Sequence, residues 1–154
     1  TMVRDVEAIN PAMLCSVLLL DAEGKHLHHG AAASLPAFYT EALDGVAIGP
    51  GVGSCGTAAF TGQRVIVEDL SLSPWWADFL DLARQADLGA CWSQPILSAQ
   101  GKVLGTFAIY HRLPTKPEPE DLVLIEDEAR LAALAIEKSA AEARLQLSAS
   151  RLNH

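Results

Sequence analysis

The segment that constrains the fold most reads Ile48-Gly49-Pro50-Gly51-Val52-Gly53-Ser54-Cys55-Gly56-Thr57-Ala58-Ala59-Phe60. Its glycines predict a tight loop, and the residues that follow predict a short helix beginning near Cys55. The spacing is close to that of a dinucleotide-binding loop. That interpretation fails, because no alternating series of strands and helices follows the loop. The loop instead feeds a helix start where backbone amides can meet an anion or a carbonyl group.

The residues before this loop predict a helix, a β-hairpin and a second helix. Val3 to Ile9 is a short helical pattern stopped by Asn10-Pro11, and the apolar run Met13 to Leu20 suits a buried central strand. After the turn at residues 21–24, Lys25 to Ala33 can return as the second strand. Ser34, followed by Leu35-Pro36, then predicts a capped helix that continues through Leu43.

The residues after the loop predict a strand, a helix and a second hairpin. The β-branched triplet at 65–67 is a short strand, and Asp69 follows at its end, where polar groups can face a pocket. Ser73-Pro74 predicts the cap of a helix from Trp75 to about Ala86, with Gly89 just past its end. Two further strands form the second hairpin, Ala90 to Leu97 and Lys102 to His111.

A long helix is predicted from Glu120 to the end of the chain. One apolar face continues through its first half and can lie on a sheet: Leu122, Ile125, Ala129, Ala132 and Ile136. Beyond Lys138 the same phase continues through Ala140, Ala143, Leu147 and Ser150. A second copy in a parallel coiled coil would cover this stripe, although the alternative is that the helix packs back on its own domain. We therefore expect a globular domain over residues 1–138 and a connector helix, leading to an output domain, over residues 139–154.

Composition excludes several classes of function. The 154 residues are 50% hydrophobic, which suffices for one core, and their net charge is −8 with the basic residues scattered. Nucleic acid is therefore not an expected partner. No apolar run is long enough to cross a membrane, no export signal is evident, and three cysteines without a C-x-x-C pair do not suggest secreted disulfides. These features favour a cytoplasmic location.

Cysteines are the first candidates for chemistry. Cys55 at a helix start could be an activated thiol, although a buried free cysteine is commonly a small hydrophobic residue and no base adjoins it. Cys91 and Ser93 point to one side of their predicted strand, and Trp92 and Gln94 point to the other. Because the segments of Cys55 and Cys91 could converge, a reversible disulfide stays open.

The histidines and aromatics are weaker candidates. His26 and His28 share a strand face and could hold a metal or haem iron, but on a hairpin such residues are more often solvent-facing or paired with neighbours. No helix-spaced metal pair is present, so no metal site is expected. Trp75 and Trp76 cannot share one helical face, so at least one of them is expected to reach a cavity.

These segments together resemble GAF sensory domains, and the resemblance covers nearly the whole chain. It is strongest to the GAF modules that bacteria place among PAS domains, diguanylate cyclase and phosphodiesterase domains of cyclic-di-GMP signalling, and histidine kinases. The residues that carry it are Gly51 to Ala59, Asp69, Pro74-Trp75-Trp76, Ala90 to Ile96 and Gly105-Thr106-Phe107-Ala108.

The resemblance implies an α+β fold with a six-stranded antiparallel sheet, helices on one face that form dimers, and a ligand pocket on the other face. It implies a terminal helix that carries ligand or redox state to the next domain. From this likeness and from strand parity we expect the following residues at or near the pocket: Cys55, Thr57, Asp69, Trp76, Cys91, Ser93, Thr106 and Ala108.

Subclasses of the family can be compared with these residues. Bilin attachment needs a Cys-His pair that this sequence lacks, so no bilin is expected and the cofactor stays unknown. The pattern of cyclic-nucleotide-binding members is also missing. Free methionine sulfoxide reductases have a Gly-x-Gly-x-Cys-Gly-Thr-Ala segment similar to Gly51 to Ala58, with Cys55 in the matching place, but their other reactive cysteines have no clear counterpart. The sequence thus predicts a small-molecule-sensing domain without catalytic residues of its own, and the alternative is a reductase that uses Cys55 and Cys91.

Overall fold

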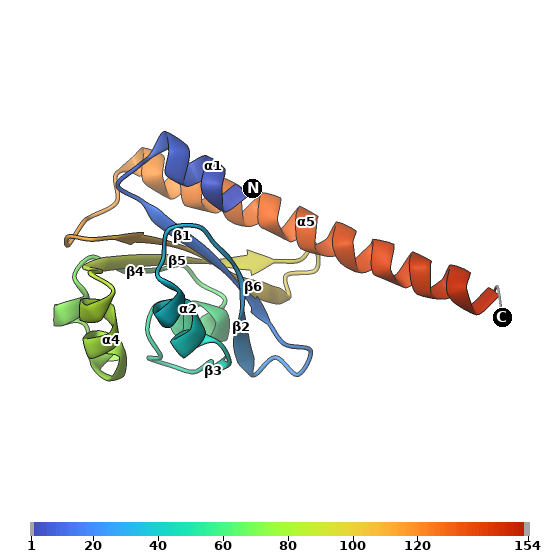
Figure 1. Ribbon diagram of the computed structural model, residues 1–154, viewed down its shortest axis with the longest axis horizontal. Coiled ribbons are helices and arrows are strands. Elements are labelled where there is room, and N and C mark those ends of the chain that lie inside the picture. Colours follow the sequence, from blue (N-terminus) through green and yellow to red (C-terminus); the bar gives the residue numbers. More distant parts are fainter. Residues whose placement is uncertain (1, 153–154) are drawn as a thin grey trace.

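The computed structural model describes residues 2–152, which form one antiparallel sheet with helices on both faces. Figure 1 shows α1 and α5 on one face of the sheet and α2 and α4 on the other. The elements of the described residues are α1 (Met2–Ile9), β1 (Leu14–Leu20), β2 (His26–Ala32), α2 (Ala37–Leu43), β3 (Val46–Ala47), α3 (Cys55–Thr61), β4 (Val65–Val67), the 3₁₀ helices η1 (Leu70–Leu72) and η2 (Pro74–Phe79), α4 (Leu80–Gln85), β5 (Ala90–Leu97), β6 (Val103–His111) and α5 (Pro119–Leu152).

The sheet has six strands in the order β3-β2-β1-β6-β5-β4, and every pairing is antiparallel. The two predicted hairpins supply its centre, where β1 pairs with β6. This confirms the expected α+β fold and six-stranded sheet. The sequence pattern did not predict β3, because a strand of two residues between Gly45 and Ile48 is too short to show alternation.

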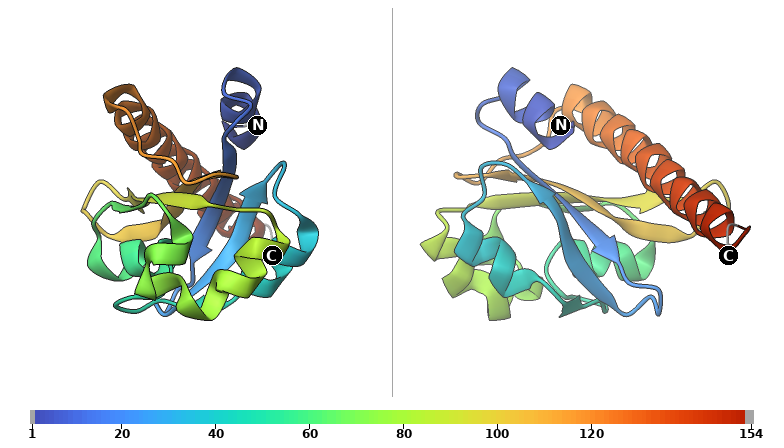
Figure 2. Two further views of the ribbon diagram at one scale, coloured as in Figure 1. Left: turned by 90° about the vertical axis from the view of Figure 1, so that its left-hand side faces the viewer. Right: turned by 45° about the vertical axis from the view of Figure 1, so that its right-hand side comes forward.

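The two faces of the sheet bury separate apolar clusters. Leu14, Cys91 and Tyr110 point toward α2, α3, η2 and α4, whereas Trp92, Phe107 and the other residues of the second cluster point toward α1 and α5. Neighbouring residues of β5 and β6 alternate between these clusters, as strand geometry requires. The sheet therefore separates a compact, loop-rich layer from the long helix (Figure 2).

Helix α5 lies on the sheet over its first half and projects beyond it over its second (Figure 1). Its buried residues are Ile125, Ala129, Ala132 and Ala133, close to the predicted stripe. After Lys138 nearly every described residue is exposed, and Leu145 and Leu152 have exposed fractions of 71% and 85%. The predicted change in environment along this helix is thus present. The predicted helix also included Asn153 and His154, which lie outside the described residues.

Two helix boundaries differ from the prediction. Ser34 does not cap α2; its hydroxyl donates to Glu7 Oε1, and α2 begins only after Pro36, whose backbone is extended. Gly89 does not end α4. Asp87 takes the left-handed conformation there, with φ +59°, while a Cβ at Gly89 would lie 2.6 Å from the Arg112 carbonyl oxygen. Gly89 is thus needed for the close approach of two backbones, not for a helix cap.

The segment predicted as one helix from Trp75 to Ala86 is divided. Its first part is the 3₁₀ helix η2 and its second part is α4. Ser73 precedes η2 without a side-chain capping bond, and Pro74 occupies the first turn. The tighter winding of η2 places Trp76 in the core with 3% of its surface exposed, while Trp75 stays 42% exposed.

Candidate functional site

The glycine-rich loop holds the start of α3 against η2. Gly51 has φ +83°, and a Cβ there would lie 2.8 Å from Trp75 Cδ1, so only glycine fits. The Thr57 hydroxyl donates to the Gly53 carbonyl at 2.7 Å and accepts from the Val52 amide at 3.0 Å. Thr57 thus fastens the loop to the helix and fixes the place of the first helical residue, Cys55.

Ser54 joins three elements beneath the loop. Its hydroxyl donates to the Cys91 carbonyl of β5 at 3.1 Å and accepts from Trp76 Nε1 of η2 at 3.0 Å. Ser54 is fully buried, so both bonds lie away from water. A buried polar side chain with satisfied partners restricts the packing of its neighbours, and here it fixes the indole beside the thiols.

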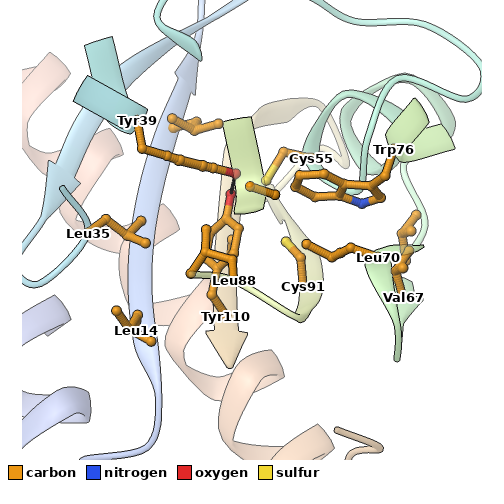
Figure 3. Packing of buried hydrophobic residues seen from close by; sticks show 14 of the residues in the cluster. Leu14, Leu35, Tyr39, Cys55, Val67, Leu70, Trp76, Leu88, Cys91 and Tyr110 are labelled. Carbon is orange, nitrogen blue, oxygen red and sulfur yellow. Dashed lines mark hydrogen bonds between the residues drawn. The ribbon is translucent and has the colours of Figure 1, made fainter. Parts of the chain in front are cut away.

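Two thiols meet at one hydroxyl in this layer. The Ser93 Oγ lies 2.9 Å from Cys55 Sγ and 3.9 Å from Cys91 Sγ, and all three side chains are buried. Figure 3 shows both cysteines beside Trp76. Thr106 lies on the same face of the sheet, is fully buried, and its Oγ1 has no hydrogen-bond partner within the described part of the chain.

The pKa values of the two thiols are shifted in opposite directions. A hydrogen bond from the Cys91 thiol lowers the pKa of Cys55, with further help from the Ser93 and Thr106 hydroxyls, and these bonds outweigh the effect of burial. Burial raises the pKa of Cys91 well above its ordinary value, and the negative charge on Cys55 adds to this. The otherwise unpartnered Thr106 hydroxyl therefore has an acceptor once Cys55 is a thiolate. Of the two thiols, Cys55 is therefore the one that forms a thiolate more readily.

A cavity of about 30 Å³ lies beside Cys55, between the sheet and the layer that contains η2. Its lining is mainly apolar and includes Leu18, Trp76, Phe79 and Tyr110. The volume is enough for one or two water molecules and far below the roughly 300 Å³ of small metabolite pockets. A larger ligand would have to displace the loop or η2.

A pair of tyrosines borders the cluster. Tyr39 of α2 and Tyr110 of β6 share a hydrogen bond of 3.0 Å between their hydroxyls, and their rings meet edge to face at 5.6 Å (Figure 3). Burial raises the pKa of both phenols well above its ordinary value. Both hydroxyls are therefore neutral donors and acceptors at physiological pH.

The structure brings six of the eight predicted site residues to this face of the sheet. Cys55, Trp76, Cys91 and Ser93 form the cluster, and Thr106 and Ala108 lie on the same face of β6. The Thr57 hydroxyl forms its hydrogen bonds with the backbone of the glycine-rich loop, at Val52 and Gly53. Asp69 lies apart from the cluster: its carboxylate caps η1 by accepting from the Ser71 amide at 3.0 Å and from the Ser71 hydroxyl at 2.6 Å.

The sequence reasoning did not single out Ser54, Tyr39 or Tyr110. Tyr110 could have been found, because it shares the strand parity of Thr106 and Ala108. Ser54 directly precedes Cys55, but only the arrangement of η2 shows that its hydroxyl meets an indole. Tyr39 reaches the site from α2 through tertiary packing, which no local pattern indicates.

The paired histidines of β2 have ordinary partners. His26 Nδ1 lies 3.3 Å from Asp21 Oδ2, and His28 Nδ1 lies 3.3 Å from Asp44 Oδ1. These contacts fit the interpretation in which neighbours satisfy the imidazoles. Over residues 2–152 no group of three histidine, cysteine or acidic side chains is arranged to hold a metal ion, and no helix there is apolar and long enough to cross a membrane.

Comparisons with known proteins agree with the fold. The Methyl sulfide methyltransferase-associated sensor of Methanosarcina acetivorans is 41% identical over 150 residues, which cover 97% of this chain but 15% of that relative. The chain thus spans only a small part of the relative's length.

Solved structures with a similar fold share less sequence. A domain of a sensor histidine kinase protein from Sinorhizobium meliloti has a TM-score of 0.76 at 19% identity, covering 94% of this chain and 92% of that one. The free methionine-R-sulfoxide reductase of Neisseria meningitidis has a TM-score of 0.71 at 17% identity, covering 91% and 76%. The family model described as "GAF domain" matches residues 1–137. Since that match extends over most of the sequence, the chain belongs to the GAF domain family.

Proposed function

We propose that this chain is the sensory module of a signalling protein, and that it binds a small molecule at the cavity beside Cys55. The observation that carries the proposal is the polar cluster buried behind the cavity wall: the Cys55 thiol, which lines the cavity and has a lowered pKa, with the Ser93 hydroxyl and the unpartnered Thr106 hydroxyl beside it. Packing alone would favour apolar side chains in this position, because an unsatisfied buried hydroxyl destabilises the fold by about 1–3 kcal/mol. A ligand with a polar atom at Cys55 would hydrogen-bond to this cluster through the thiol.

A path from the cavity to α5 supports the sensory role. Trp92 lies between Cys91 and Ser93 in β5 but points to the opposite face, where it belongs to the same cluster as Ile125 of α5. Its Nε1 also donates to the Thr115 carbonyl at 3.1 Å, in the segment that leads into α5. A displacement of β5 at the site therefore moves Trp92 against the base of the long helix.

The neighbouring tryptophans offer a matched test of binding. Trp76 lines the cavity, whereas Trp75 is half exposed on the outer side. Small molecules extracted from the purified protein, together with dimethyl sulfide as a probe suggested by the relative's name, would be titrated while tryptophan fluorescence and melting temperature are followed. We expect Trp75→Phe to keep the ligand-dependent fluorescence change and Trp76→Phe to lose most of it. A chain from which nothing is extracted and whose melting temperature no compound raises would contradict the proposal.

The same proposal includes pairing of α5 with a second copy of the chain. Leu131, Leu145 and Leu152 are all more than half exposed and recur at multiples of seven residues, with Leu134 on the same side. A stripe of this period suits a parallel coiled coil, and it lies on a different face of α5 from the predicted stripe of Ala140, Ala143, Leu147 and Ser150. Leu145→Glu is expected to shift the mass in sedimentation from dimer to monomer, whereas Leu72→Glu, at an equally exposed leucine outside the helix, should not. A wild-type monomer at high concentration would contradict the pairing.

An output domain in the same polypeptide is also part of the proposal. Its support is the far greater length of the 41% identical relative and the fold shared with a domain of a sensor histidine kinase protein. Cyclic-di-GMP enzymes or kinases are the expected outputs, in the cytoplasm. Expression of the full-length protein, with output activity measured with and without the extracted ligand, tests this.

A reductase is the second candidate function, favoured by the Cys55 and Cys91 pair and the reductase neighbour. Free methionine sulfoxide is several times larger than the cavity of about 30 Å³, so it would have to displace the loop or η2, as any larger ligand would. Incubation with methionine-R-sulfoxide and dithiothreitol distinguishes the two. Release of methionine and water at the expense of the dithiol, lost in Cys55→Ser, would support the reductase, and the absence of turnover would dismiss it.

A further inference from the structure

The two cysteines of the site come from elements that pack together. Cys55 is the first residue of α3, Cys91 lies in β5, and α3 packs on β5 and β6. The Ser93 Oγ lies 2.9 Å from Cys55 Sγ and 3.9 Å from Cys91 Sγ. The distance between the two sulfurs therefore cannot exceed the sum of these two distances. All three cysteines of the chain are free, and Cys15 belongs to the cluster on the other face of the sheet.

We infer that Cys55 and Cys91 are a redox modification site, which closes to an intramolecular disulfide when a hydroperoxide enters the cavity and reopens with a dithiol reductant. The inference rests on the proposed function only in taking this cavity as the place where the chain meets small molecules. Cys55 lines the cavity and Cys91 does not, so the geometry gives the first sulfur the attacking role and the second the resolving role.

The reaction balances with hydrogen peroxide as oxidant. The Cys55 thiolate attacks one peroxide oxygen, the O–O bond breaks, and the departing hydroxide takes a proton to become water, leaving a sulfenic acid on Cys55. The Cys91 sulfur then attacks the Cys55 sulfur. The S–S bond forms, the S–O bond breaks, and the hydroxyl group leaves with the Cys91 proton as a second water. Two thiols are oxidised by two electrons in total, and one peroxide is reduced to two waters.

The site suits the first step in size and in polarity. A cavity of about 30 Å³ admits hydrogen peroxide directly, whereas a bulkier oxidant would have to displace the loop or η2. The Ser93 and Thr106 hydroxyls can donate to the thiolate before the attack. Afterwards Ser93 has lost its charged acceptor, and Cys55 is drawn away from the cavity toward β5. Oxidation would thus change both the binding site and the strand that carries Trp92.

Thiol counting in the whole chain tests the inference without any substitution. The protein is treated with a small excess of hydrogen peroxide, unreacted thiols are blocked under denaturing conditions, and peptides are analysed without reduction. We expect the three free thiols to fall to one, Cys15, with a Cys55–Cys91 peptide in the monomer, and dithiothreitol to restore all three. Three free thiols after treatment, or a disulfide that contains Cys15 or joins two chains, would overturn the inference.

Two variants separate the roles of the sulfurs. In Cys91→Ser the sulfenic acid on Cys55 has no resolving thiol, so dimedone should label Cys55. In Cys55→Ser neither dimedone labelling nor a disulfide is expected. Cys15→Ser is the matched control and should form the disulfide as the wild type does. Labelling of Cys91 in Cys55→Ser, at the wild-type rate of oxidation, would overturn the assigned roles.

Ligand binding by the reduced protein keeps this inference separate from the proposed function. A chain that binds an extracted molecule but forms no disulfide would overturn only the redox site. A chain that forms the disulfide and binds nothing would overturn the small-molecule ligand and leave the redox site intact.

Discussion

The two faces of the sheet are built from alternate residues of the same strands, yet they differ in chemistry. The face under α1 and α5 is packed with apolar side chains such as Phe107, Ile109 and Ile125. The opposite face buries two thiols, the Ser54, Ser93 and Thr106 hydroxyls, and a hydrogen-bonded tyrosine pair. Dispersion and burial suffice for the first face, whereas the second keeps polar groups that a stable core does not require. The apolar core and the candidate site thus lie on opposite sides of one strand pair.

The cysteines give the clearest comparison, because each face of the sheet packs against a buried thiol. Cys15 faces α1 and α5, where burial raises its pKa to about 12 and the charges of Glu7 and Glu128 act in the same direction. Cys55 is buried as well, but hydroxyl and thiol donors lower its pKa. Burial is common to both, so hydrogen bonding to the charged form decides the direction.

Alkylation of the native protein by iodoacetamide, which reaches Cys55 when the loop or η2 moves aside, should show the largest contrast between the faces. A thiol with a pKa near 12 has on the order of 1,000-fold less thiolate at pH 7.5 than an ordinary cysteine, whereas Cys55 has more. We expect Cys55 to be modified at least several hundred times faster than Cys15, measured by peptide mass spectrometry over time. In urea the two rates should become similar. Equal rates in the native protein would remove the distinction between the faces.

Truncations on β6 should separate packing from polar contacts. Phe107→Ala on the α5 face removes a fully buried ring and is expected to lower the free energy of unfolding by about 3–5 kcal/mol. Tyr110→Phe on the site face removes only a hydroxyl and should lower it by about 1 kcal/mol. Urea unfolding of both variants measures the difference, and similar losses would mean that the site face also depends on its polar contacts for stability.

Apart from β3, the strands and the long helix were predictable from the sequence because their patterns are local. Alternation places Cys91 and Ser93 on one side of their strand and Thr106 and Ala108 on one side of theirs, and the pairing of the two strands joins these sides into one face. The apolar period of α5 likewise separates its packed half from its projecting half. The resemblance to GAF domains then predicted that these segments form one six-stranded antiparallel sheet, as observed.

The remaining features depend on contacts between distant segments. Asp69 follows a strand, which suggested a place at the pocket, but its carboxylate finds nearer donors in Ser71 and caps η1 instead. Ser34 has the residue type of a helix cap, yet Glu7 from the first helix takes its hydroxyl. A polar side chain can form hydrogen bonds with several partners, and the tertiary fold determines whether a local or a distant partner is used.

Thr106→Val should separate stability from reactivity on the site face. The wild-type hydroxyl has no partner in the described structure, so the isosteric methyl group is expected to leave the free energy of unfolding unchanged or raise it by about 1 kcal/mol. Alkylation of Cys55 should slow severalfold, because the thiolate loses a donor. Ser93→Ala, the matched variant, should slow the reaction further and also lower stability. A loss of stability in Thr106→Val would show that the hydroxyl is satisfied.

The smallest effect concerns His111, where the chemistry of the α5 face departs from pure packing. Its ring lies 4.6 Å from Trp92, its Nδ1 is buried without a partner among the described residues, and burial lowers its pKa while the charge of Asp121 raises it. As pH falls below about 6.5, the unfolded chain binds this proton before the folded chain does, so the free energy of unfolding should decrease toward the folded pKa and be unaffected above 6.5. Asp121→Asn keeps an oxygen for the Glu118 amide but removes the charge, so urea unfolding between pH 5 and 7 should show a slightly larger acid loss than in the wild type. His111→Gln should remove this part of the pH dependence, and an unchanged slope in both variants would mean that acid sensitivity arises elsewhere in the chain.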